Sequence, residues 1–208
     1  MSASPILWDV DTQVDFMEPT GKLYVPGAEE RRAAMGRLVR AARAAGIVHV
    51  ASADDHVLAD IEISEAPNFA STYPPHCMRD TPGAEKIPET RQAEPLVLEP
   101  IACAALAELA RDRREFLLLK QSTDVFTNAN AAALLDCFQP SEVIVFGVAT
   151  DVCDHQAIMG LRDRGWSVAF VEDAASGLSD ERVAVCTAEW RELGVRFTTT
   201  DAVVSGWS

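Results

Sequence analysis

Three side chains that could act together in nucleophilic catalysis each stand where an apolar run of the sequence ends: Asp11, Lys120 and Cys153. A carboxylate, a cation and a thiol supply a base, a charge stabiliser and a nucleophile. Each also has a plain structural alternative, because Asp11 could cap a turn, Lys120 could extend to solvent and Cys153 could pack in the core. Their occurrence at the same kind of position favours catalysis.

The surroundings of Cys153 distinguish it from the other cysteines. Residues 147–153 lead from an apolar strand into a helix, and a helix N-terminus stabilises a thiolate, so we expect Cys153 to be nucleophilic at neutral pH. The five cysteines are odd in number and form no CxxC pair, which indicates reduced thiols in a cytosolic protein. The remaining four are Cys77, Cys103, Cys137 and Cys186.

The elements that must position these residues follow an alternating pattern. Short runs rich in β-branched residues predict buried strands at 6–10, 47–51, 116–119, 143–148 and 168–171, with a weaker strand at 96–98 and an edge strand or none at 195–199. Helical spacing predicts helices at 29–45, 103–113, 131–138, 152–164 and 180–193. Alternating strands and helices predict an α/β fold, a three-layer αβα sandwich with a mainly parallel central sheet. In such a sheet the strands' carboxyl ends meet at one ligand-binding edge.

The length, charge and hydropathy of the chain limit its domain number, its partners and its location. A chain of 208 residues fits a single domain over 1–208 better than two half-length ones. A net charge of -14 would repel phosphate backbones, so we expect no nucleic-acid partner. No apolar run approaches the roughly 18 residues of a membrane span, and the N-terminus shows no export signal, so we expect a cytoplasmic protein without a membrane partner.

One segment, at about 54–93, breaks the alternating pattern. It contains five of the eleven prolines and shows no regular period. Irregular segments of this length inside a compact domain usually serve function, so we interpret it as a functional insertion.

Two motifs and the central lysine resemble those of a known enzyme group. Residues 11–16 read Asp-Thr-Gln-Val-Asp-Phe, and residues 147–153 read Gly-Val-Ala-Thr-Asp-Val-Cys. With Lys120 between them, they resemble the isochorismatase-like cysteine hydrolase superfamily, and most of all its nicotinamidases and pyrazinamidases. The similarity runs from residue 6 to about residue 177, which implies the isochorismatase-like form of the α/β fold.

The resemblance implies a catalytic triad. Cys153 is then the nucleophile, Asp11 the proton acceptor and later donor, and Lys120 the cation that holds both in ionised form. It also implies a cis peptide bond between Val148 and Ala149, which would aim the backbone amides of Ala149 and Cys153 at the developing oxyanion.

The insertion resembles the metal-binding part of nicotinamidases. Asp54 and His56 match an Asp-x-His pair, and His76 matches the histidine of a downstream Pro-Pro-His-Cys stretch, which implies one divalent ion, Zn, Fe or Mn. Many nicotinamidases have a further histidine where this chain has Glu62, so we expect Glu62 as the fourth ligand, with Glu65 as the alternative. Surface histidines without a metal are the competing interpretation.

Two aromatic residues match the positions that hold a pyridine ring in the family, Phe16 and Tyr73, although the second is more often tryptophan there. Ordinary packing is an equally good explanation for Tyr73. Asp15 is expected to be a structural hydrogen-bond acceptor rather than a catalyst.

The resemblance as a whole implies a cysteine amidohydrolase that hydrolyses nicotinamide, or a close pyridine carboxamide, to the acid and ammonia through a thioester. One alternative is a hydrolase of another small amide on the same scaffold, such as maleamate, a carbamoylated amine or biuret. A second is a non-catalytic binding or oligomer module. By analogy with the superfamily we expect a homo-oligomer whose other partner is a small-molecule amide.

Overall fold

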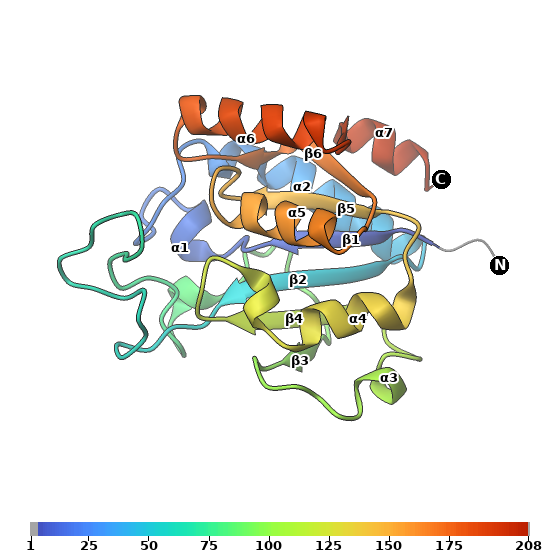
Figure 1. The fold of residues 1–208 in the computed structure, drawn as a ribbon, viewed down its shortest axis with the longest axis horizontal. Coiled ribbons are helices and arrows are strands. Elements are labelled where there is room, and N and C mark those ends of the chain that lie inside the picture. Colours follow the sequence, from blue (N-terminus) through green and yellow to red (C-terminus); the bar gives the residue numbers. More distant parts are fainter. Residues whose placement is uncertain (1–3, 208) are drawn as a thin grey trace.

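Seven parallel strands form one sheet between two layers of helices in the computed structural model, which describes residues 4–207 (Figure 1). The strands run in the order β3-β4-β2-β1-β5-β6-β7 across the sheet. Their bounds are β1 (Ile6–Val10), β2 (Val48–Asp54), β3 (Leu96–Leu98), β4 (Glu115–Lys120), β5 (Val143–Val148), β6 (Val168–Ser176) and β7 (Arg196–Thr198). The predicted αβα sandwich is confirmed, and the segment at 195–199 is an edge strand.

Each face of the sheet packs against its own helices. One face carries α3 (Leu106–Leu109), α4 (Asn130–Phe138), α5 (Cys153–Asp163) and α6 (Asp180–Glu192). The other carries α1 (Val14–Met17), α2 (Ala28–Ala44) and α7 (Thr200–Ser205). Two short 3₁₀ turns complete the set, η1 (Pro82–Ala84) and η2 (Val125–Thr127).

The first strand shows why the central strands are apolar at almost every position. In β1, Ile6, Trp8 and Val10 pack into the core on the α5 side, while Leu7 packs into the core on the α2 side. All five residues of the strand are buried. A strand covered on both faces therefore lacks the polar alternation of a half-exposed one.

Two strands are longer than their apolar runs predict. The run at 47–51 becomes β2, which continues to Asp54, and the run at 168–171 becomes β6, which continues to Ser176. The polar end of β2 is buried because its groups have partners: Ser52 donates to Asp11, and the Asp54 amide donates to Gln13. Polar residues can thus extend a buried strand when the site at its end satisfies them.

The predicted helix at 103–113 is wrong in extent, because α3 covers only Leu106–Leu109. In that window only Leu106 and Ala110 are buried, so little apolar packing supports a longer helix. The other four predicted helices form within one residue of their expected ends. The short helices α1 and α7 were not predicted.

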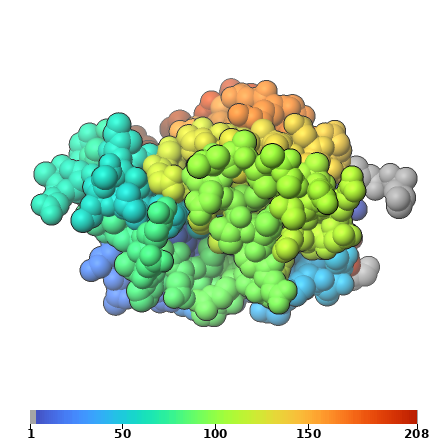
Figure 2. Space-filling model, turned by 90° about the horizontal axis from the view of Figure 1, so that it is seen from below, coloured from blue at the N-terminus to red at the C-terminus, as the bar shows by residue number. Residues whose placement is uncertain are grey.

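The insertion between β2 and β3 leaves the sheet at its carboxyl end. Isolated bridges link His56 to Met78, Ile63 to Tyr73, and Gln13 of the main domain to Lys86. The teal part of this segment projects at one end of the molecule (Figures 1 and 2). Among the described residues, no helix is both long enough and apolar enough to cross a membrane.

Candidate active site and metal centre

Neighbouring strands deliver the polar groups of the site to one edge of the sheet. Asp11 follows β1, while Asp54 and Lys120 are the last residues of β2 and β4 and are paired in register. Cys153 begins α5, the helix that follows β5. Because all of these strands are parallel, residues far apart in sequence meet at their carboxyl ends.

Lys120 lies at the centre of this group. Its Nζ is 2.9 Å from Asp11 Oδ2 and 3.9 Å from Cys153 Sγ, and it also contacts Asp54 Oδ1. The lysine is 1% exposed, so its four-carbon chain runs through the core and does not reach solvent. The structure therefore brings together the three residues expected to form a triad and adds a second carboxylate.

The charges in this group stabilise one another. Burial alone would lower the pKa of Lys120, but the carboxylates of Asp11 and Asp54 outweigh burial and hold that pKa well above its usual value. Burial would likewise raise the pKa of Asp54, yet Lys120 and the two histidines beside it hold that pKa well below the usual range. Both residues are therefore ionised at neutral pH.

The thiol of Cys153 behaves differently from the expectation based on its helix. Burial raises the pKa of the Cys153 thiol well above its ordinary value; Lys120 opposes this rise, and the negative charges of Asp11 and Asp54 add to it. Desolvation disfavours the thiolate and so opposes the stabilisation expected from the first turn of α5. In the free site the thiol is neutral, so attack requires a base, and Asp11 is beside it.

Two residues without a predicted role hold this arrangement. Ser52 Oγ donates to Asp11 Oδ1 at 2.6 Å. The side-chain amide of Gln13 accepts from the Asp54 amide at 2.7 Å and donates to the Asp54 carbonyl at 2.7 Å. The signal in the sequence is a polar residue adjoining a strand otherwise buried on both faces, where only a specific partner makes burial tolerable.

Asp54 also belongs to a candidate metal site with His56 and His76. One ligand atom from each of the three buried residues lies within 4.8 Å of the others. Asp54 Oδ2 is 3.7 Å from His56 Nε2 and 3.4 Å from His76 Nε2. Two ligands bound at about 2.1 Å to a tetrahedral ion are roughly 3.4 Å apart, so the spacing fits a divalent metal.

The Nδ1 atom of each histidine already has a hydrogen-bond partner. His56 Nδ1 is 3.2 Å from Asp60 Oδ2, and His76 Nδ1 is 2.8 Å from the Pro74 carbonyl oxygen. His56 Nε2 is buried without a hydrogen-bond partner. Metal-binding histidines typically bond through one nitrogen to a carboxylate or carbonyl and present the other to the ion. Asp54, His56 and His76 therefore fit a divalent metal ion.

The structure does not bring either candidate glutamate into this three-residue cluster. Glu62 lies on the wall of the adjoining pocket, where its Oε1 accepts from the Thr123 amide at 3.2 Å. Glu65 is exposed. Asp15, expected to be structural, accepts from the Lys22 and Cys77 amides, which confirms that expectation.

A small cavity, about 30 Å³ in volume, lies over Cys153. Both predicted aromatics line it, and their rings lie 5.4 Å (Phe16) and 6.1 Å (Tyr73) from the ring of His76. Burial raises the pKa of the Tyr73 hydroxyl, so it remains a neutral group in this wall. The other residues that line the pocket are Leu23, Val25, Asp54, Glu62, Thr123, Val148, Ala149, Val152 and Leu178.

The link from β5 to α5 carries the candidate oxyanion donors. The peptide bond between Val148 and Ala149 is cis. The Ala149 carbonyl accepts from the Val152 and Asp154 amides, but no described residue accepts from the Ala149 or Cys153 amide. Both amides are therefore free to donate to a negatively charged oxygen beside the thiol.

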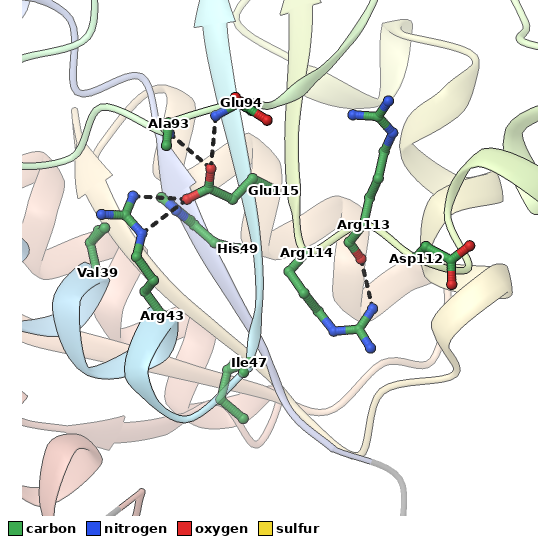
Figure 3. Close-up of a pocket in the computed structure, with 11 residues that line it drawn as sticks. Val39, Arg43, Ile47, His49, Ala93, Glu94, Asp112, Arg113, Arg114 and Glu115 are labelled. Carbon is green, nitrogen blue, oxygen red and sulfur yellow. Dashed lines mark hydrogen bonds and ion pairs between the residues drawn. The ribbon is translucent and has the colours of Figure 1, made fainter.

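A second cleft lies at the opposite edge of the sheet, near the amino ends of β2 and β4 (Figure 3). In this cleft Glu115 accepts from Arg43 and from the amides of Ala93 and Glu94, while the ring nitrogens of the buried His49 have no hydrogen-bond partner. It contains neither a thiol nor the metal cluster. The chemistry of the described residues therefore points to the Cys153 pocket.

Comparisons with known proteins agree with the fold and motifs. The sequence profile of the isochorismatase domain matches residues 6–202. The chain is similar to a Mycobacterium tuberculosis protein named nicotinamidase/pyrazinamidase, with 27% identity over 191 residues that cover 89% of this chain and 94% of the relative.

Solved structures resemble the fold over nearly their full length. The pyrazinamidase of Pyrococcus horikoshii in complex with zinc superposes with a TM-score of 0.77 at 23% identity, covering 94% of this chain and 99% of the other. The N-carbamoylsarcosine amidase of Thermoplasma acidophilum superposes with a TM-score of 0.73 at 21% identity, covering 95% and 97%. The same fold thus carries amidases for different substrates.

Proposed function

This chain belongs to the isochorismatase family, and on that premise we propose that it is a cysteine amidohydrolase that converts nicotinamide, or a close pyridine carboxamide, to the acid and ammonia. The observation that carries the proposal is the position of Cys153 Sγ, 3.9 Å from Lys120 Nζ in the wall of a pocket that also includes metal-cluster residues Asp54 and His76. A nucleophile and a ring-nitrogen binding site thus face the same small space.

The triad supplies the proton transfers. Asp11 accepts the proton of the Cys153 thiol as sulfur attacks the amide carbonyl, and it then returns that proton to the departing ammonia. Lys120 stays charged throughout and offsets the negative charge that passes between the other two residues. Water then cleaves the thioester, so one difficult hydrolysis becomes two acyl transfers.

Residues of the pocket wall stabilise the oxyanion and bind the ring of the substrate. The amides of Ala149 and Cys153 stabilise the oxyanion, and losing one such donor typically costs about 3 kcal/mol of transition-state stabilisation. Phe16 and Tyr73 provide faces for a flat ring. A divalent ion held by Asp54, His56 and His76 would supply a ligand position for the ring nitrogen.

The choice among amides rests on similarity and charge. The M. tuberculosis relative is named nicotinamidase/pyrazinamidase, and the P. horikoshii structure is a pyrazinamidase with zinc. No lysine or arginine is among the described residues that line the pocket, which disfavours a substrate with its own carboxylate, such as maleamate.

The proposal is tested by ammonia release from nicotinamide, pyrazinamide, maleamate and biuret. We expect turnover of the two ring amides, and at least a 10³-fold loss in Cys153→Ala with the fold retained. The matched control is Cys186→Ala, which removes another buried thiol that does not line the pocket and should keep near-normal turnover. Turnover of maleamate or biuret alone would move the function to another small amide, and near-normal turnover by Cys153→Ala would overturn the nucleophile.

A further inference from the structure

We propose that Glu62 recognises a hydrogen-bond donor on the substrate, so that the preferred substrate is a ring carboxamide bearing a second N–H or O–H group. This inference rests on the proposed function and narrows its substrate class. It assigns Glu62 to recognition of the substrate and not to the metal.

The backbone of the insertion fixes Glu62 next to the aromatic wall of the pocket. The Tyr73 amide donates to the Glu62 carbonyl at 2.7 Å, and the Ser64 amide donates to the Tyr73 carbonyl at 2.9 Å. A bridge between Ile63 and Tyr73 completes this small ladder. Glu62 and Tyr73 are therefore neighbours that line the pocket together.

One carboxylate oxygen is anchored and the other is available. Oε1 of Glu62 accepts from the Thr123 amide at 3.2 Å, which ties the insertion to the loop after β4. Throughout residues 4–207, no side chain donates to Glu62 and no cation pairs with it. The second oxygen is thus an acceptor without a partner, beside the space that the substrate enters.

The charges around the pocket indicate which groups the free Glu62 oxygen would bind. The two carboxylates that line the pocket are Asp54 and Glu62, and Asp54 is engaged by Lys120. Glu62 is outside the cluster of Asp54, His56 and His76. A free carboxylate in a wall without cations attracts donors and repels anions.

The test compares nicotinamide with its 5-amino and 6-amino derivatives, using the metal-loaded enzyme and chromatography of the acid product. We expect at least one amino derivative to exceed nicotinamide in kcat/KM by about 10-fold. Glu62→Gln should reduce that ratio about 10-fold with the metal content unchanged. Glu94→Gln, the same substitution on an exposed residue at the far edge of the sheet, should leave the ratio unchanged.

Binding to the inactive Cys153→Ala variant separates this inference from the proposed function. Adding Glu62→Gln should weaken binding of the amino derivative, measured by calorimetry, about 10-fold relative to nicotinamide. If the native enzyme hydrolyses no pyridine carboxamide, the proposed function fails, while the binding ratio still decides the role of Glu62. An unchanged ratio, or a loss of metal in Glu62→Gln, would overturn the inference.

Discussion

Asp54 gives its two carboxylate oxygens to two different sites. Oδ1 contacts Lys120, while Oδ2 faces His56 and His76. Lys120 in turn contacts Asp11, so one buried cation serves both the candidate triad and the candidate metal centre. At the scale of single residues these two sites are therefore one electrostatic unit.

Removing the cation from this unit should be costly. We expect Lys120→Met to abolish turnover and, after chelation of metal, to lower the free energy of unfolding by about 3 to 5 kcal/mol, because two buried carboxylates lose their counter-charge. Adding Asp11→Asn removes one of those carboxylates, so the double variant should be more stable than the sum of the single losses by at least about 1 kcal/mol. Denaturant unfolding of the four proteins measures this coupling, and strict additivity would show that Asp11 and Lys120 do not interact.

The catalytic residues can be predicted from the sequence more easily than the residues that hold them in place. Asp11, Lys120 and Cys153 are recognisable because each ends or follows an apolar run at the edge where ligands bind. For Ser52 and Gln13 the sequence shows only that a polar residue adjoins a buried strand, and it does not show their partners, the Asp11 carboxylate and the Asp54 backbone, which are 41 residues away in the chain. Contacts of that kind depend on sheet register, which the sequence does not display.

At the scale of elements, the site depends on how closely β5 approaches β1. Gly147 has a φ of 145°, and a Cβ atom there would lie 2.1 Å from the Val10 carbonyl oxygen. Neither backbone can yield, because both strands lie in the centre of the sheet. Glycine at 147 therefore sets the spacing between the strands that precede Asp11 and Cys153.

Gly147→Ala should separate these strands and lower both stability and turnover. We expect a loss of at least about 3 kcal/mol in the free energy of unfolding and at least about a 100-fold loss in kcat, since a displacement of about 1 Å can cost that much. The control is Gly46→Ala, where φ is 68° but nothing lies within 4 Å of the added Cβ. That variant should lose only about 1 kcal/mol and keep its turnover, and equal losses in both would attribute the effect to backbone angle alone.

A buried ion pair joins β1 to the end of the insertion. Lys86 Nζ donates to Asp9 Oδ1 at 2.9 Å and to the Ser52 carbonyl at 3.0 Å. Burial alone would raise the pKa of Asp9, but Lys86 and His49 outweigh burial and lower it. A lowered pKa adds stability above the usual titration range of aspartate, and this contribution disappears as the pH falls through the folded-state pKa.

Lys86→Met should therefore shift acid unfolding to higher pH. Without its cation the pKa of Asp9 rises, so the folded state takes up a proton earlier during acidification, and at pH 7 the variant should lose about 3 kcal/mol. Arg91→Met removes an exposed partner of Glu85 and should change neither quantity measurably. Circular dichroism against pH measures the midpoints, and coincident midpoints would contradict a stabilising role for Lys86.

The elements themselves were predictable where burial was continuous. The central strands and the four longer helices follow directly from apolar spacing, because each buries a complete stripe or both faces. The segment at 103–113 has the spacing of a helix, but only Leu106 and Ala110 find a place in the core. Periodicity shows which residues could be buried and does not show whether a partner surface exists.

At the scale of the whole molecule, the insertion is anchored by Cys77 and Ile87 in the core, but its projecting part buries few apolar side chains. Its most exposed apolar side chains, Leu58, Ile61 and Phe69, are 74%, 89% and 61% exposed, so burial does little to hold that part in place. His56 stands at the start of the insertion and His76 some twenty residues later, and both face Asp54 at the end of β2. A metal ion at this cluster would close that loop against the sheet.

Chelation should therefore release the insertion before it unfolds the protein. An ion present at 100 times its dissociation constant stabilises the bound state by about 2.7 kcal/mol, so its removal should lower the melting temperature and accelerate chymotrypsin cleavage after Phe69 and Leu58. His76→Ala should be cleaved at the fast rate with or without added metal. His155→Ala, which alters a histidine outside the cluster, should retain the native response. Elemental analysis should find one ion per chain in the native protein and in His155→Ala, and none in His76→Ala. Equal cleavage of native protein before and after chelation would mean that polar contacts such as that between Glu62 and Thr123 hold the insertion without the metal.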